Sequence, residues 1–101
     1  MSDKIQTMLN FAIRASTTVF GVDNIPSCKN KHVIIACSTL SENSLKQLLK
    51  ENVKTPIIRT KKPLEEIIHR GGKAIAIKDR NMANEIMKNI NDDYELISEG
   101  N

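Results

Sequence analysis

Side chains that could carry out catalysis are scarce in this 101-residue chain. The two histidines, His32 and His69, stand in none of the spacings that bind zinc, and we interpret both as structural residues. The carboxylate pairs at 65–66 and 92–93 are neighbours in sequence, so they do not face each other as an acid and a base would. The chain contains neither a G-x-S-x-G turn nor a phosphate-binding G-x-x-x-x-G-K-[ST] loop. The sequence therefore predicts a protein that is not an enzyme and uses no metal or other cofactor.

The spacing of the two cysteines indicates neither a redox motif nor a zinc site, and free thiols are typical of a cytoplasmic protein. Cys28 and Cys37 are nine positions apart, which matches neither a C-x-x-C pair nor half of a zinc site. Cys37 follows an apolar run and is predicted to be a small core residue. The apolar runs are too short for a membrane span or a secretory signal. We expect a cytoplasmic protein with free thiols and no membrane partner.

Positive charge is in modest excess, with 15 Lys and Arg against 12 Asp and Glu, a net charge of +3 and a pI near 9.0. Basic residues concentrate at Lys29–Lys31, at 59–62 and at Lys73, and each group can be either a phosphate contact or a solvated loop. Gly71 and Gly72 before Lys73 fit a backbone nest for a phosphate, or alternatively a helix end turning into a strand. Only three residues are aromatic and none is Trp, which weakens any prediction of base stacking.

Apolar spacing predicts alternating helices and strands. A first helix carries an apolar stripe from Ile5 to Ile13, and later helices start at the cap residues Ser41 and Asp79 and at Pro63. The helix from Pro63 is expected to end at 71–72. Strands are predicted at 18–20, 32–37, 55–59 and 73–78, with a brief helical turn around Pro26. Residues 94–97 are either an edge strand or a segment lying across the surface.

This alternation predicts one α/β domain spanning residues 1–101. The expected architecture is a three-layer α/β/α sandwich with a mostly parallel central sheet of about four strands. The predicted core consists of Leu9, Val33, Ile35, Leu45, Leu48, Ile57, Ile67, Ile75, Ile77 and Ile86.

An ordered set of segments resembles the kink-turn RNA-binding ribosomal protein family, the L-seven-Ae and L-thirty-e superfamily with its small bacterial paralogues. LNFAIRA at 9–15 and VFG at 19–21 are similar to the family's first helix and glycine entry. VIIACSTLSEN at 33–43, TPIIR at 55–59, PLEEI at 63–67 and KAIAIKD at 73–79 resemble its later strands and helices. The likeness spans about residues 4 to 90 and implies an α/β/α sandwich that binds kinked RNA without catalysis.

The resemblance also implies which residues contact RNA. The family's G-x-N-E-x-x-K segment corresponds to residues 21–27, in which Gly21, Asp23 and Asn24 fit the pattern of polar groups that reach base edges. The family's final lysine is replaced by Ser27, and Lys29 or Lys31 is the implied substitute. A second contact region of the family corresponds to Arg70, Gly71, Gly72 and Lys73. The positively charged residues of these regions are expected to form one basic patch, which would contain Lys29, Lys31, Arg70 and Lys73.

Two functions are consistent with these residues. The first is a non-catalytic RNA-binding protein that recognises kinked RNA in ribosomal or another structured RNA. The second is a protein-interaction module that kept the fold and lost RNA binding, suggested by Pro26, Ser27 and the short segment between Gly21 and His32. That alternative expects an exposed apolar surface around Val22 and Ile25, or at 94–97. The sequence indicates no oligomeric state.

Overall fold

A five-stranded mixed sheet forms the centre of the protein in the computed structural model, which describes residues 4–68 and 72–100. The strands are β1 (Thr18–Phe20), β2 (Val33–Ala36), β3 (Ile57–Thr60), β4 (Ala74–Ile77) and β5 (Tyr94–Ser98), arranged in the order β1-β4-β2-β3-β5. Of the four pairings, only β2 with β3 is parallel. The prediction of a mostly parallel sheet of about four strands is therefore wrong. The segment near the C-terminus is an edge strand, which decides between the two alternatives for 94–97.

The connections explain the strand directions. A helix crosses over between β2 and β3 and returns the chain to the same end of the sheet, so these two strands are parallel. Strand β4 instead enters between β1 and β2 and runs antiparallel to both. Its Ala-Ile-Ala-Ile sequence is buried throughout, and such a run fits a central strand in either direction.

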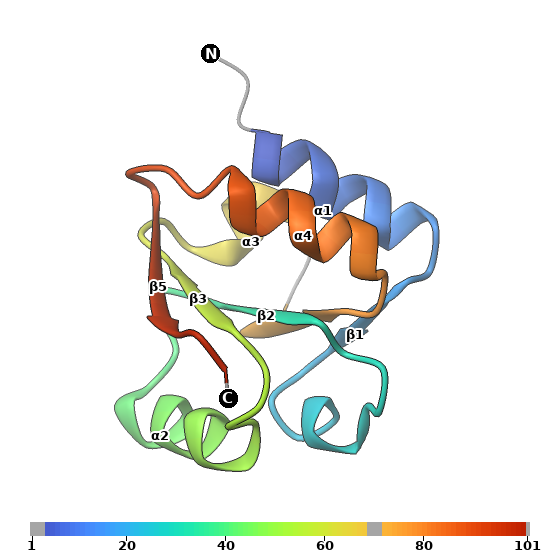
Figure 1. Cartoon of the computed structure of the whole chain (residues 1–101). Helices are drawn as coiled ribbons and strands as arrows, with labels where there is room; N and C mark the ends of the chain where they lie inside the picture. Colours follow the sequence, from blue (N-terminus) through green and yellow to red (C-terminus); the bar gives the residue numbers. More distant parts are fainter. Residues whose placement is uncertain (1–3, 69–71, 101) are drawn as a thin grey trace.

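Helices cover both faces of the sheet, as predicted. The α-helices are α1 (Lys4–Arg14), α2 (Glu42–Glu51), α3 (Leu64–Ile68) and α4 (Arg80–Lys88), and a short 3-10 helix, η1 (Ile25–Ser27), forms the predicted turn at Pro26. Figure 1 shows α1, α3 and α4 on one face, with α2 and η1 on the other. None of the helices in the described part of the chain is long and apolar enough to cross a membrane.

The central strands divide the core between these two faces. Val33 and Ile35 of β2 belong to the apolar cluster under α1, α3 and α4, whereas Ile34 and Ala36 belong to the cluster over α2 and η1. This alternation follows from the two-residue period of a strand. The predicted core residues are all buried except Leu45, which is half-buried and packs against the second cluster.

Side-chain caps fix where two of the helices begin. The Ser41 hydroxyl accepts a hydrogen bond from the Ser44 amide at 3.2 Å, and the Asp79 carboxylate accepts one from the Met82 amide at 3.1 Å. Both predicted caps are confirmed, and each satisfies a backbone donor that the helix leaves free. The predicted end of the Pro63 helix falls on Gly71, which lies outside the described residues.

Candidate functional site

The sheet register separates the predicted basic residues into two groups. Val33, at the start of β2, pairs with Ile77 at the end of β4, and Ala36 pairs with Ala74. Lys29 and Lys31 precede β2 and therefore lie at one end of the sheet, while Lys73 precedes β4 and lies at the other. A four-residue strand spans roughly 10 Å. The expectation of one patch that includes Lys29, Lys31 and Lys73 is thus wrong, because the antiparallel direction of β4 moves Lys73 away.

The two segments that resemble RNA-contact regions do meet at the carboxyl end of β2. The Gly21 amide donates to the Ala74 carbonyl at 3.0 Å, joining the end of β1 to the start of β4. Gly72 packs against the ring of Phe20, where a Cβ atom on Gly72 would lie 3.3 Å from Cδ1. Gly21 and Gly72 both have positive φ, at 96° and 140°, a conformation that glycine adopts without steric cost. Arg70 and Gly71, the other members of the second segment, lie outside the described residues.

The loop after β1 is held in place by its own hydrogen bonds. The Asn24 amide nitrogen of the backbone donates to Gly21 O at 3.1 Å, and the Asn24 side-chain Nδ2 donates to Phe20 O at 3.0 Å. Asp23 and Asn24 are both exposed. The loop therefore presents a carboxylate and an amide oxygen to solvent from a fixed backbone.

A polar network adjoins this loop at the carboxyl end of β2. Lys73 Nζ donates to Thr39 Oγ1 at 2.6 Å, and Thr39 Oγ1 lies 3.0 Å from Cys37 Sγ. Because the ammonium can only donate, the Thr39 hydroxyl accepts from Lys73 and has its own proton free for the sulfur. The Leu64 amide donates to the same sulfur at 3.2 Å. The buried thiol and its neighbours therefore connect the loop 37–39 with the start of α3 at Leu64 and with Lys73 before β4.

The same contacts change the acidity of that thiol. Burial raises the pKa of Cys37, but the Thr39 hydroxyl, the backbone amides of Leu64 and Thr39 and the nearby charge of Lys73 lower it further than burial raises it. The net effect is a pKa below the ordinary value of a cysteine. Since Cys37 is only 1% exposed, this thiol is a structural acceptor rather than an accessible nucleophile. The prediction of a buried Cys37 is confirmed.

Hydrogen bonds to neighbouring residues also fix the loop at residues 37–39. Arg59 Nη2 donates to Ser38 O at 3.0 Å, and the Ser38 amide donates to Thr60 Oγ1 at 3.1 Å. The Thr60 hydroxyl in turn donates to Lys62 O at 2.6 Å. From the sequence, the run at 59–62 was interpreted as either a phosphate contact or a solvated loop, and neither interpretation included this hydrogen bond from Arg59. The available signal was the Cys-Ser-Thr sequence directly after a buried strand, because short hydroxyl side chains favour local hydrogen bonds to backbone.

The opposite end of the sheet holds Lys29 and Lys31. Lys31 Nζ donates to the carbonyls of Ile25 at 3.1 Å and Pro26 at 3.4 Å, so its ammonium binds the carbonyls of η1. Lys29 is exposed. Both line a surface hollow of about 380 Å³, together with residues 28 and 51–55. In this hollow the buried Asn52 side chain donates to Leu48 O at 2.8 Å, while its Oδ1 accepts no hydrogen bond from any described residue.

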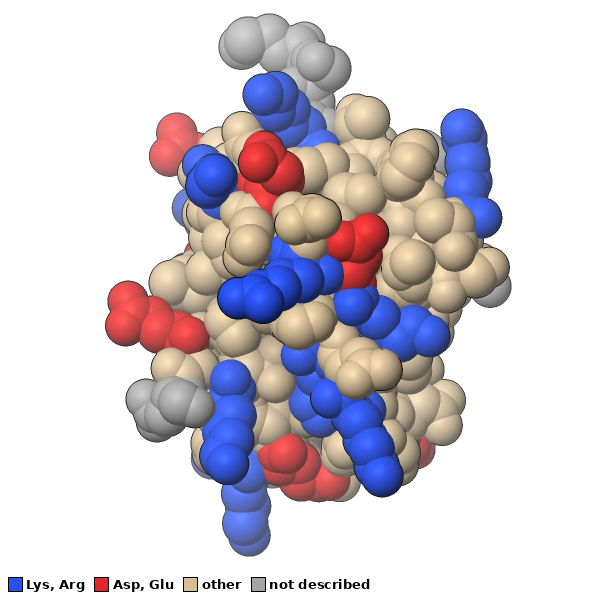
Figure 2. Space-filling model, turned by 45° about the vertical axis from the view of Figure 1, so that its right-hand side comes forward, with Lys and Arg blue, Asp and Glu red and all other residues tan. Residues whose placement is uncertain are grey.

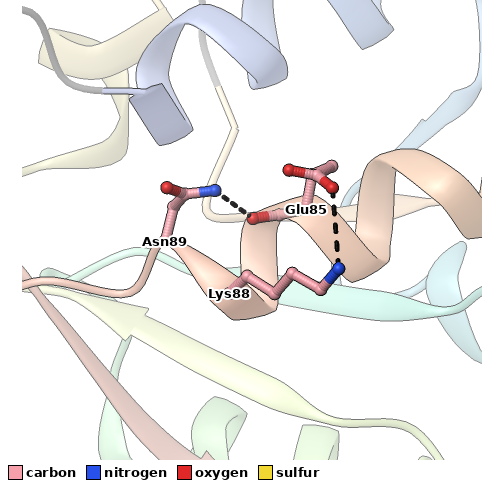
Figure 3. A network of polar contacts seen from close by, with 3 residues as sticks. All are labelled: Glu85, Lys88 and Asn89. Carbon is pink, nitrogen blue, oxygen red and sulfur yellow. Dashed lines mark hydrogen bonds and ion pairs between the residues drawn. The ribbon is translucent and has the colours of Figure 1, made fainter.

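Most cations of the described residues are free of carboxylate partners. Figure 2 shows Lys and Arg over much of one face, most of them in its middle and lower parts, with Asp and Glu side chains among them. Among residues 4–68 and 72–100, the one ion pair joins Lys88 to Glu85 at 3.8 Å on α4, where Asn89 also donates to the Glu85 carbonyl at 2.7 Å (Figure 3). That pair is exposed and adds little stability. The remaining cations can therefore attract an anionic partner.

The apolar surface expected for an interaction module is absent from one of its two predicted places. Ile25 is fully buried and Val22 is half-buried against the same cluster, so the surface expected around Val22 and Ile25 is not exposed. Leu96 and Ile97 of β5 also pack partly against the core. Within 4–68 and 72–100, the exposed large hydrophobic residues are Phe11 and Val53, neither of which was predicted as an interaction surface.

Comparison with known proteins identifies the fold alone. No family model and no curated protein matches the chain. A solved structure of a protein with unknown function from Bacillus halodurans C superimposes with a TM-score of 0.77 at 18% sequence identity, covering 86% of this chain and 96% of that one. The chain is thus similar in fold to that protein over nearly its whole length.

Proposed function

We propose that this chain is a non-catalytic, cytoplasmic RNA-binding protein that recognises a kinked structured RNA, ribosomal RNA included, at the carboxyl end of β2. The observation that carries the proposal is the contact between two segments distant in sequence. The loop from Gly21 to Asn24 and the segment Gly72–Lys73 are the two regions that resemble RNA-contact elements, and they adjoin through the Gly21–Ala74 hydrogen bond and the Gly72–Phe20 contact.

The chemistry of this end of the sheet suits a bent RNA backbone. Gly72 carries no side chain, so a phosphate or sugar can approach its backbone closely. Lys73 is exposed and supplies positive charge for a phosphate. Asp23 and Asn24 offer oxygen acceptors to the amino groups of bases in a kinked, unpaired or non-standard stem. Phosphate contacts would position the RNA, and the two acceptors would select it.

Lys29 and the other cations at the amino end of β2 have a different part in this proposal. They lie across the sheet from the base-contacting loop, so they attract RNA over a distance and do not read the kink. Lys31 is bonded to η1 and contributes mainly to folding. The substitute for the family's missing lysine is then Lys73, rather than Lys29 or Lys31.

Binding to a kink-turn RNA and to a matched duplex, measured across a salt series, tests the proposal. The variants Asn24→Ala and Lys73→Gln should weaken kink-turn binding and reduce the preference over duplex. Lys73→Gln should also lower the salt slope by roughly 0.7–0.9, the effect of one phosphate contact. The matched control is Lys78→Gln, an exposed residue following β4 at the opposite end of the sheet, which should keep the preference.

Equal binding of both RNAs by the unaltered protein would contradict kink recognition. Equal losses of preference in Lys73→Gln and Lys78→Gln would contradict the assignment to the carboxyl end of β2.

One observation favours the alternative of a protein-interaction module. Residues Ile25–Ser27, the last three of the segment 21–27 that resembles the family's recognition element, form a single 3-10 turn in which Ile25 is buried and no residue is cationic. If the purified protein binds neither RNA at low salt and captures a folded protein partner, this alternative replaces the RNA-binding proposal.

A further inference from the structure

Phe11 is an exposed aromatic residue on the outer side of α1. Its side chain is 60% exposed, although apolar burial normally stabilises a phenylalanine by about 1.5–3 kcal/mol. The neighbouring apolar residues of the helix, Leu9 and Ala12, point into the core and are fully buried. Phe11 therefore plays no part in holding α1 against the sheet, and its ring is available to a ligand.

Phe11 also lines a polar hollow of about 470 Å³, whose other described walls are Gln6, Thr7, Asn10 and Arg14. All of these residues lie on one side of α1, because positions 7, 11 and 14 and positions 6 and 10 form two adjacent rows at helical spacing. The size of the hollow falls in the range of small-ligand sites. Its walls combine one aromatic ring, one hydroxyl, two amides and one guanidinium.

The two amides have fixed orientations. Gln6 Nε2 donates to the Ile67 carbonyl at 3.0 Å, and Asn10 Nδ2 donates to Gln6 O at 2.9 Å and to Ile67 O at 3.4 Å. These bonds anchor both side chains by their nitrogen atoms. Neither amide oxygen accepts a hydrogen bond from another described residue, so both can accept one from a ligand in the hollow that these residues line with Phe11.

We propose that this hollow binds one unpaired nucleobase that carries an exocyclic amino group. The base stacks on the Phe11 ring, and its amino group donates to the amide oxygens of Gln6 or Asn10. Arg14, an exposed cation in the last turn of α1, pairs with the adjoining phosphate. The inference rests on the proposed function in taking RNA as the ligand. It adds a second RNA contact, separate from the loop 21–24 and the segment Gly72–Lys73.

Charge and hydrogen bonding favour a nucleotide over other occupants. The described residues of α1 include Lys4 and Arg14 and no acidic residue, so this side of the helix attracts an anion. An aliphatic partner surface would cover the ring but would leave two amide oxygens unpaired, which costs free energy on burial. A second copy of this chain would bring the same acceptors and the same positive charges face to face. An amino-bearing nucleotide satisfies the ring, the acceptors and the cation together.

The absence of tryptophan from the chain gives a direct test. In the variant Phe11→Trp the indole is the sole tryptophan, and its fluorescence reports stacking. We expect a short oligoadenylate to quench this fluorescence, and an abasic oligonucleotide of the same length to leave it unchanged. The matched control is Val53→Trp, placed at the other exposed large hydrophobic residue, which should not be quenched. Quenching of both variants, or quenching by the abasic strand, would overturn the proposal.

Affinity measurements separate stacking from simple apolar contact. Phe11→Ala should weaken oligoadenylate binding by roughly 5- to 150-fold, which corresponds to the free energy of one base–aromatic stack. Phe11→Leu should be weakened similarly, because it keeps apolar volume but lacks a ring. Full affinity in Phe11→Leu would overturn the proposal, as would self-association that buries the indole without nucleic acid in analytical ultracentrifugation.

The same experiment distinguishes this site from the proposed kink recognition. Quenching should persist when Lys73→Gln is added to Phe11→Trp. If the indole is not quenched while the unaltered protein still prefers kink-turn RNA, the α1 site fails and the proposed function stands. If the indole is quenched but no preference for kink-turn RNA exists, the proposed function fails and the α1 site stands.

Discussion

Replacement of Thr39 by valine isolates the hydrogen bond that supports the Cys37 thiol. Valine has nearly the same shape as threonine but no hydroxyl, so Thr39→Val removes the link between Lys73 Nζ and Cys37 Sγ without changing the loop volume. The sulfur keeps its bond from the Leu64 amide. We expect the Cys37 pKa to rise in this variant, because the hydrogen bond from the Thr39 hydroxyl, the strongest of the contacts that lower this pKa, is lost.

The size of the effect on stability follows from the number of bonds removed. One hydrogen bond within a protein contributes about 0.5–1.5 kcal/mol, and more when one partner is charged. A lowered pKa in the folded state means that the unfolded chain holds more protons between the folded and the ordinary pKa of the thiol. The free energy of unfolding supplied by the thiolate therefore increases as pH rises through this window, and is lost as pH falls below the folded pKa. In Thr39→Val the free energy of unfolding should increase less over the same rise in pH.

The assay combines titration with denaturation. In a Cys28→Ser background Cys37 is the one cysteine of the chain, and the ¹³C chemical shift of its Cβ reports its ionisation. Urea denaturation at neutral and alkaline pH then measures the stability difference between Thr39→Val and the parent. Thr39→Ser, which retains the hydroxyl, is the control and should behave like the parent. An unchanged Cys37 pKa in Thr39→Val would refute the role assigned to the hydroxyl.

Three further substitutions test the fold, each measured by thermal or urea unfolding. Gly72→Ala should lose about 1–3 kcal/mol, because φ is 140° and the new methyl group would lie 3.3 Å from Phe20; no loss would mean that this backbone is not constrained. Ile35→Ala removes a fully buried side chain and should cost about 2–5 kcal/mol, against at most ~0.5 kcal/mol for the exposed Val53→Ala control. Asp79→Ala should cost about 0.5–2 kcal/mol through loss of the α4 cap, and Asp79→Asn, which keeps an acceptor, should recover most of it.

The sequence predicted the elements better than their directions. Ser41 and Asp79 marked helix starts because a cap is a local interaction between near neighbours. The Ala-Ile-Ala-Ile sequence of β4 predicted a buried strand, because this pattern is also contained in a few neighbouring residues. The direction of β4 relative to β2 depends on pairs of residues distant in sequence, such as Ala36 with Ala74. The alternating Ala-Ile-Ala-Ile sequence of β4 is compatible with a parallel or an antiparallel neighbour. No local pattern carries that information.

The candidate site was predictable only in part, for the same physical reason. Gly21 was singled out by the family resemblance, and Gly72 by the same resemblance and by its place in the glycine pair before Lys73. Both have positive φ in the structure, a conformation that favours glycine. The positions of Lys29 and Lys73 relative to each other depend on the direction of β4. The wrong prediction of a mostly parallel sheet was therefore accompanied by the wrong prediction of a single basic patch. The exposure of Phe11 agrees with the helical spacing, because Phe11 lies outside the predicted apolar stripe of Ile5, Met8, Leu9, Ala12 and Ile13. The hollow beside it was not predicted, because it depends on the side chains that surround Phe11 in the fold.

The pairing of β3 with β5 has a consequence for the newly made chain. Thr60 pairs with Tyr94 and Ile57 with Ser98, so one side of β3 has no strand partner until residues 94–98 have been synthesised. At usual rates of synthesis the delay is roughly 2–7 s. During this time the apolar β3 presents unpaired backbone groups that can join a strand of another chain. Completion of the five-stranded sheet, and protection of β3 from aggregation, therefore require that β5 has been synthesised.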